Sequence, residues 1–209
     1  MTTGLLRNVK GPNLVAMLLF LGSGLVIHDV MGSGEVGDKH PWDLAQLMKE
    51  RSQVSHTYAR FTEEKHSNLL ATPLILSGTL RYDAPSRVER HTKSPFEQRY
   101  IVDGDTLLIE RHKKRPRTLS LQDHPVLWAF IEGFRATLSG NLETLQMFYE
   151  TRLHGDREHW RLVLVPRHDD MSKRVESIHI EGKQAQITQI EIREVGGDSS
   201  RMSIRENLL

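Results

Sequence analysis

The sequence predicts a mainly β protein with a helical lid, an α+β chain in which helices cover the dry face of one highly curved antiparallel sheet. Three observations predict this fold class. Most of the chain beyond residue 55 divides into short segments of alternating apolar and polar residues, separated by turns. The Asp103-Gly104 pair between two such segments is a strong hairpin signal, because glycine readily adopts a positive φ. An apolar helical stretch at 125–138 interrupts the strands.

The N-terminus predicts a targeting segment. Residues 1–13 carry Arg7 and Lys10 and no acid, and an apolar run follows at 14–27, which is shorter than a comfortable membrane span. Small residues at 32–34 offer a cleavage zone. We therefore expect residues 1–34 to be a signal peptide and the mature protein to start near residue 35. An uncleaved N-terminal anchor and a buried helix of the fold are the alternatives. Export without cysteine suits a Gram-negative periplasm.

The first half of the exported chain predicts one helix and then strands. Residues 41–54 place apolar side chains on one face at helical spacing. The hairpin at 77–95 is too charged to lie in a sheet that is buried on both faces, so its sheet has one wet and one dry side. The apolar face of such a curved sheet must be covered. Because few helices are available, we expect them to lie on the concave side of the sheet or across its open end. The expected strands are 56–65, 74–83, 87–93, 97–102 and 105–111.

The second half predicts an insertion and then more strands. Residues 125–138 carry an apolar stripe at i, i+3, i+4, i+7 and i+11, and 142–148 form another short helix. Such a stripe fits either a core helix or a lid that faces a ligand, and the pattern leaves both open. The expected strands are 148–154, 159–166, 174–181, 186–193 and 200–205.

Composition excludes several function classes. There is no cysteine, so disulfides, thiolate metal sites and cysteine nucleophiles are excluded, as is a lipid-modified N-terminal cysteine. A net charge of +1 argues against a nucleic-acid binder. No catalytic or phosphate-binding motif occurs, so we expect neither an enzyme nor a cofactor.

Three polar features were weighed as sites. His154 and His159 flank a turn, and a solvated hairpin tip is a better interpretation of them than a metal site. Asp169-Asp170 is better explained by a loop or a helix cap than by a cation site. The run 111–117, RHKKRPR, is either a solvated hairpin tip or a contact patch for anionic lipid or an acidic partner.

A resemblance adds to these patterns. The ordered series FTEE at 61–64, SGTL at 77–80, APSR at 84–87, TKSP at 92–95 and VDGDTL at 102–107 resembles the LolA family of periplasmic lipoprotein carriers, from about residue 42 to 206. The resemblance implies an unclosed β-barrel of about eleven antiparallel strands, with helices as a lid over an apolar cavity, in a carrier domain at 35–209.

The resemblance also implies a function. A monomeric carrier would take acylated cargo from an inner-membrane exporter and pass it to an outer-membrane acceptor, holding the acyl chains in its cavity. The alternatives are a related carrier of aryl-polyene or glycolipid cargo, and a membrane-anchored envelope interaction protein without cargo. The expected cavity and lid residues are Leu80, Tyr82, Val88, Arg90, Tyr100, Leu107, Ile109, Leu127, Phe130, Ile131 and Phe134.

Two departures from the family pattern concern the lid. Ala84 stands where classical members carry an arginine that hydrogen-bonds the lid shut, so the link is absent or rebuilt by Arg87 or Arg90. Arg90 stands where an aromatic is usual. If Arg90 faces inward, its charge needs a lipid head group, a lid carboxylate such as Glu132, or water. The sequence thus predicts a preference for cargo with an anionic or polar head.

Overall fold

The structure is a computed structural model that describes residues 42–206. The predicted signal segment at 1–34 lies outside the described residues. No helix within 42–206 has the length and apolar character needed to cross a membrane.

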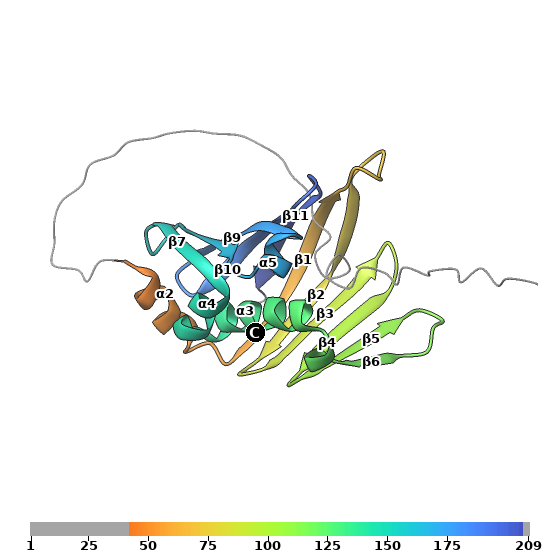
Figure 1. Ribbon diagram of the computed structural model, residues 1–209, viewed down its shortest axis with the longest axis horizontal. Coiled ribbons are helices and arrows are strands. Elements are labelled where there is room, and N and C mark those ends of the chain that lie inside the picture. Colours follow the sequence, from red (N-terminus) through yellow and green to blue (C-terminus); the bar gives the residue numbers. More distant parts are fainter. Residues whose placement is uncertain (1–41, 207–209) are drawn as a thin grey trace, which may run out of the picture.

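One sheet of eleven antiparallel strands forms the body of the molecule, which confirms the predicted fold class (Figure 1). The strand order is β6-β5-β4-β3-β2-β1-β11-β10-β9-β8-β7. The strands are β1 (His56–His66), β2 (Leu74–Asp83), β3 (Arg87–Ser94), β4 (Gln98–Asp103), β5 (Thr106–Arg111), β6 (Arg117–Ser120), β7 (Tyr149–Gly155), β8 (Trp160–Pro166), β9 (Val175–Lys183), β10 (Gln186–Glu194) and β11 (Ser199–Glu206).

The topology explains where the helices must go. Each strand pairs with its sequence neighbour except at two places: β1 pairs with β11, and β6 and β7 are the two free edges. The chain therefore has to travel from one edge of the curved sheet to the other between residues 120 and 149. The helices α3 (Pro125–Ser139) and α4 (Leu142–Phe148) make this connection. They follow the concave side, as Figure 1 shows.

The remaining helices are short. In α2 (Leu44–Arg51), Asp43 caps the N-terminus by accepting a hydrogen bond from the Gln46 N–H at 2.8 Å. Gly140 ends α3 with φ +70°, and a Cβ at this position would lie 2.0 Å from the Met48 carbonyl oxygen of α2. Only glycine therefore permits this close approach of the two helices. A 3₁₀ turn (Leu121–Asp123) precedes α3, and α5 (Asp169–Ser172) joins β8 to β9.

Three details differ from the sequence prediction. The first helix begins at Leu44 rather than residue 41, because the Asp43 cap sets its start. The edge strand β6 was not predicted, since its first residue, Arg117, is the last of the basic run and three of its four residues are exposed. Asp169 and Asp170 form the first turn of α5, where the helix dipole favours acids.

The inner face changes character along the strands. On β1, Ala59, Phe61, Glu63 and Lys65 alternate with exposed residues and are all buried. The inner face therefore runs from apolar to charged within one strand. Most of the buried residues form a single hydrophobic core between the sheet and the helices.

Candidate functional site

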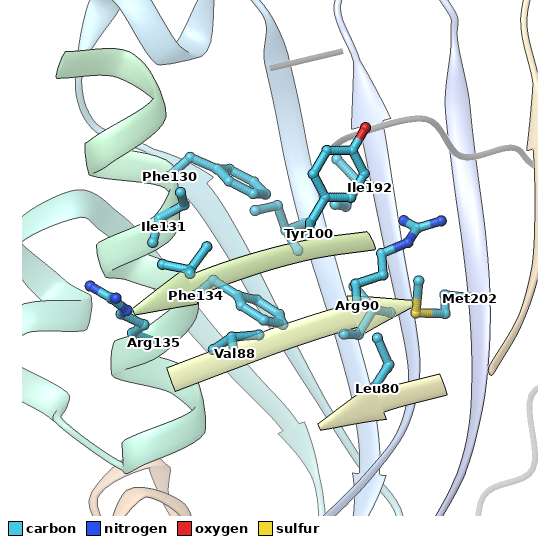
Figure 2. A pocket seen from close by; sticks show the side chains of 13 residues that line it. Leu80, Val88, Arg90, Tyr100, Phe130, Ile131, Phe134, Arg135, Ile192 and Met202 are labelled. Atoms are coloured by element: carbon cyan, nitrogen blue, oxygen red, sulfur yellow. The ribbon is translucent and has the colours of Figure 1, made fainter. Parts of the chain in front are cut away.

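An apolar cavity of about 120 Å³ lies between α3 and the inner face of the sheet. Seven of the predicted site residues line it, namely Leu80, Val88, Arg90, Tyr100, Phe130, Ile131 and Phe134 (Figure 2). They come from β2, β3 and β4 on one side and from α3 on the other. The apolar stripe of α3 thus borders a cavity as well as the core.

A second cavity of about 60 Å³ adjoins the first. The predicted residue Tyr82 lines this one, and Leu80, Val88, Phe134 and Ile190 line both. Of these four shared residues, Phe134 is the one on α3, so a movement of this helix would change both linings.

Three predicted site residues lie elsewhere. Leu107, Ile109 and Leu127 are buried in the hydrophobic core and line neither cavity. Leu107 and Ile109 do face inward on β5, but this strand lies next to the edge strand β6. The alternation predicted their direction correctly, while their position across the sheet could not be read from it.

Sequence reasoning missed the far wall of the cavity. This wall comes from β9, β10 and β11 and consists of Ile178, Ile190, Ile192 and Met202, while Val102 and Arg135 complete the lining. The same alternation that singled out Leu80 and Tyr82 is present in these strands and would have found the wall. Pairing of β1 with β11 is what brings the two halves of the chain together.

Arg90 faces inward, and the chain itself supplies its counter-charge. Its Nη2 donates to Glu63 Oε2 on β1, and its guanidinium lies 4.9 Å from the centre of the Phe61 ring. The Arg90–Glu63 contact reaches across β2, which lies between β1 and β3. Gly78 of β2 pairs with Phe61 on β1 and Thr92 on β3, and it has no side chain that could obstruct this contact. The side chain of Glu63 is completely buried.

Glu132, the lid carboxylate named as a candidate partner for Arg90, does not hold it. Glu132 accepts a hydrogen bond at 2.6 Å from Arg135, three residues later on the same helix. The two arginines of the cavity lining extend to opposite sides of it (Figure 2). An α3 carboxylate next to an α3 arginine is satisfied locally, which leaves Arg90 to pair across the sheet.

The far end of the sheet's inner face is polar. Burial raises the pKa of Glu63, against the opposing effect of Arg90. Burial lowers the pKa of Lys65 to about 7. Burial, together with the charge of Asp198, raises the pKa of Glu194 to about 7. The Oε1 atom of Glu63 is buried with no hydrogen-bond partner among the described residues. This end offers hydrogen bonds, while the end under α3 offers apolar surface.

Two arginines attach the helices to the barrel. Arg135 of α3 donates at 2.6 Å to the Gly104 carbonyl in the β4–β5 turn. Arg51 of α2 donates at 2.9 Å to the Leu138 carbonyl of α3, and also to the Ala185 carbonyl in the β9–β10 turn. Neither arginine stands at the family position, which is Ala84.

The two residues named as replacements have other partners. Arg87 pairs with Asp103 at 2.8 Å, and Arg90 pairs with Glu63. The prediction that Arg87 or Arg90 rebuilds the link was therefore wrong, because both lie on the sheet and find sheet carboxylates. Within the described residues, the hydrogen bonds from α2 and α3 to sheet turns come from Arg51 and Arg135 on the helices.

The two histidines that flank the β7–β8 turn are exposed. His154 and His159 border a polar groove at the β7–β8 turn, where the amides of Glu158 and His159 donate to Asp156. No group of three metal-ligating side chains occurs within residues 42–206.

Comparison with known proteins identifies the family. No curated protein matches the chain. Solved structures with a similar fold include the LolA superfamily protein NE2245 from Nitrosomonas europaea, at 8% identity and a TM-score of 0.42 over 76% of this chain and 90% of that one. The MucA/MucB complex of Pseudomonas aeruginosa is similar at 14% identity with a TM-score of 0.43, and the match covers 78% of this chain and 56% of that one. LprF from Mycobacterium bovis is similar at 10% identity with a TM-score of 0.36, and the match covers 78% of this chain and 91% of that one.

These likenesses concern the fold, and the family assignment rests on a separate match. The model of the family described as outer membrane lipoprotein carrier protein LolA-like matches residues 37–205. Since this match spans most of the chain, the protein belongs to the LolA-like family, whose fold typically binds lipids or lipoproteins.

Proposed function

We propose that this protein is a non-catalytic periplasmic carrier that holds the acyl chains of a lipoprotein or lipid and moves them from the inner to the outer membrane. The observation that carries the proposal is the apolar cavity between α3 and the sheet, together with family membership. Transferring an acyl chain from water into such a site gains about 0.8 kcal/mol per methylene. This gain makes transit through an aqueous compartment feasible without any chemical step.

The size of the cavity indicates that the described state is closed. Its volume of about 120 Å³ is close to that of an apolar cavity of about 150 Å³ that holds benzene. A long acyl chain needs more room. Because the helices are held to the sheet by two arginines and apolar contacts, outward movement of α3 is the simplest way to provide it. Phe134, which lines both cavities, would move with the helix.

Identification of bound cargo tests the proposal directly. Purified protein from its native host should release an acylated molecule that mass spectrometry detects. In addition, Phe130→Glu should weaken binding of a fluorescent fatty-acyl probe at least tenfold, because it places a charge in the apolar lining. Trp128→Glu is the matched control, since Trp128 lies on α3 but lines neither cavity. Equal probe affinity for the parent and Phe130→Glu, with a normal circular dichroism spectrum, would refute the site.

The same small volume favours a second candidate. A membrane-anchored envelope protein that binds a protein partner would need no cargo, and its interior would stay closed. Such a protein would yield no acylated molecule and would bind no acyl probe under any condition. The carrier should bind the probe, and the rates of probe entry and release should both rise when α3 is loosened.

A further inference from the structure

Four hairpin turns project from the same end of the sheet. In an antiparallel sheet, alternate connections lie at the same end. At this end lie the hairpin turns at 67–73, 95–97, 112–116 and 195–198, together with the β8–β9 connection at 167–174, which contains α5. The tips that follow β1, β3 and β5 extend on one side of the molecule in Figure 1. We call these four turns and the strand residues next to them the hairpin rim.

Exposed apolar side chains gather on the hairpin rim. Within residues 42–206, eight large apolar or aromatic side chains are exposed, and five of them belong to the rim. Leu69 is 91% exposed at the apex of the longest turn, and Phe96 is 48% exposed at the next tip. The other three are Leu70, Ile75 and Val195. A single exposed leucine needs no explanation, but this concentration at one end indicates a contact surface.

The rim also carries basic side chains without counter-charges. Lys93, Lys113, Lys114, Arg115 and Arg117 are exposed, and none makes an ion pair with a described residue. Some exposed arginines elsewhere are paired, such as Arg152 with Glu150 and Arg161 with Glu181, while Arg60 and Arg167 are exposed and make no ion pair with a described residue. At the opposite end of the sheet, the β4–β5 turn carries Asp103 and Asp105 instead. Four of these five basic side chains fall within residues 113–117, so the rim carries a dense positive cluster at the β5–β6 turn.

The apolar apex is held in place. Asp198 of the β10–β11 turn accepts hydrogen bonds from the Ser67 hydroxyl at 2.7 Å and the Asn68 amide at 3.0 Å. The Asn68 side chain donates to the Gly196 carbonyl at 2.8 Å. Two turns that are far apart in the sequence thus support each other and present Leu69 and Val195 from one ordered unit. A contact made by an ordered loop loses less conformational entropy than one made by a flexible loop.

We propose that the hairpin rim docks on the surface of an anionic lipid bilayer. Unpaired lysines and arginines attract anionic head groups, and exposed aliphatic and aromatic tips enter the interface between head groups and acyl chains. An acidic protein surface would match the charges but would not require aliphatic apices. This docking goes beyond cargo binding, because no rim residue named above lines either cavity. It would bring the carrier to the surface where lipid is exchanged.

Vesicle binding tests the charge part of the proposal. The full chain should bind vesicles containing phosphatidylglycerol more tightly than vesicles of phosphatidylcholine alone, and added salt should reduce the difference. The triple variant Lys113→Glu/Lys114→Glu/Arg115→Glu should lose at least tenfold in affinity for the anionic vesicles, because each basic residue near such a surface contributes a factor of about five.

The matched control changes the same net charge at another place. Arg152→Glu/Arg157→Glu/Lys183→Glu alters three exposed basic residues near the β7–β8 hairpin, away from the rim. This control should retain the affinity of the parent to within about threefold. An equal loss in both triple variants, or no preference of the parent for anionic vesicles, would overturn the proposal. Both variants should bind an acyl probe like the parent, so failure here is separate from failure of the carrier function.

Insertion of the apex is tested by fluorescence. The chain has no cysteine, so Leu69→Cys provides one labelling position for an environment-sensitive dye. Its emission should shift to shorter wavelength when anionic vesicles are added. The same dye at Met147→Cys, an exposed position on α4, should not shift. A shift at both positions or at neither would contradict insertion of the rim, and both labelled proteins contain the same N-terminal segment.

Discussion

The two walls of the cavity are held by different kinds of interaction. The sheet wall is a continuous ladder of antiparallel strands, and a buried charge pair, Arg90–Glu63, crosses its inner face. The lid wall, α3, is attached by apolar contacts and by arginine side chains that donate to backbone carbonyls. A ladder opens only when the fold opens, whereas a helix that rests on a few hydrogen bonds can move separately. On the proposed carrier function, we therefore expect the sheet wall to fix the shape of the cavity and the lid wall to control access.

The largest expected effect comes from breaking the charge pair of the sheet wall. Glu63→Leu leaves the Arg90 charge buried without a partner and should lower the free energy of unfolding by about 3–5 kcal/mol. The double variant Glu63→Leu/Arg90→Leu should recover most of this loss. Urea denaturation of the four proteins of this cycle measures the coupling. Additive effects of the two changes would mean that the pair is not a unit.

The next effect concerns the junction of lid and α2. Gly140→Val forces a β-branched residue to φ +70° and against the Met48 carbonyl, so we expect a loss of about 1–3 kcal/mol. Gly104→Val is the control, because Gly104 also has a positive φ (+52°) but nothing lies within 4 Å of its Cβ position. If the two variants lose the same stability in thermal denaturation, the close contact between α3 and α2 contributes nothing beyond the backbone strain at a positive φ.

Ligand selectivity should follow from the sheet wall. Because Glu63 already neutralises Arg90, the parent should distinguish little between anionic and neutral ligands of equal chain length. This differs from the preference for anionic heads that Arg90 alone predicts. Glu63→Gln should raise affinity for a fatty acid about tenfold, since a charge-assisted hydrogen bond to Arg90 becomes available. Titration with a fatty acid and the matching monoacylglycerol checks this, and a parallel gain for both ligands would count against it.

Loosening the lid wall should change rates more than stability. Arg135→Ala removes the hydrogen bond to the Gly104 carbonyl and should cost about 1 kcal/mol. We expect dissociation of an acyl probe to become several-fold faster in stopped-flow measurements. Arg99→Ala, which removes an exposed arginine of the sheet, is the control and should leave the rate unchanged. A slower or unchanged rate in Arg135→Ala would show that the link does not retain the lid.

The smallest effects are two pH dependences at the polar end of the sheet wall, and the first concerns Glu194. The pKa of Glu194 is raised from 4.5 to about 7, so its stabilising contribution is present below pH 4.5 and is lost as the pH rises through 7. Glu194→Gln lacks this loss. Its stability relative to the parent should therefore grow by on the order of 1 kcal/mol between pH 4.5 and 7. Parallel denaturation profiles of the two proteins across this range would refute the shift.

Lys65 should give the same kind of result in a different pH window. Its pKa is lowered from 10.5 to about 7, so its contribution is present above pH 10.5 and is lost as the pH falls to 7. The free energy of unfolding of Lys65→Met, relative to that of the parent, should therefore increase as the pH falls from 10.5 to 7 in the same denaturation assay. A constant difference from pH 7 to 10.5 would contradict the lowered pKa.

The sequence by itself determined the elements and the direction of most side chains. Alternation predicted that Leu80, Tyr82 and Val88 share the inner face, because successive residues of a strand point to opposite sides. It left the direction of Arg90 open, and the structure places this side chain inward. The 3.6-residue period likewise placed Phe130, Ile131 and Phe134 on one face of α3. Local rules of this kind need no knowledge of partners.

Only the tertiary structure decided which inward residues meet. Pairing of β1 with β11 brought Ile190, Ile192 and Met202 to the cavity, while the place of β5 beside the sheet edge put Leu107 and Ile109 in the core. The partner of Arg90 is likewise 27 residues away on another strand, and the lid is held by Arg51 from a different helix. Such contacts depend on strand order and register, which arise from the packing of the whole sheet. A local sequence pattern therefore cannot predict these contacts.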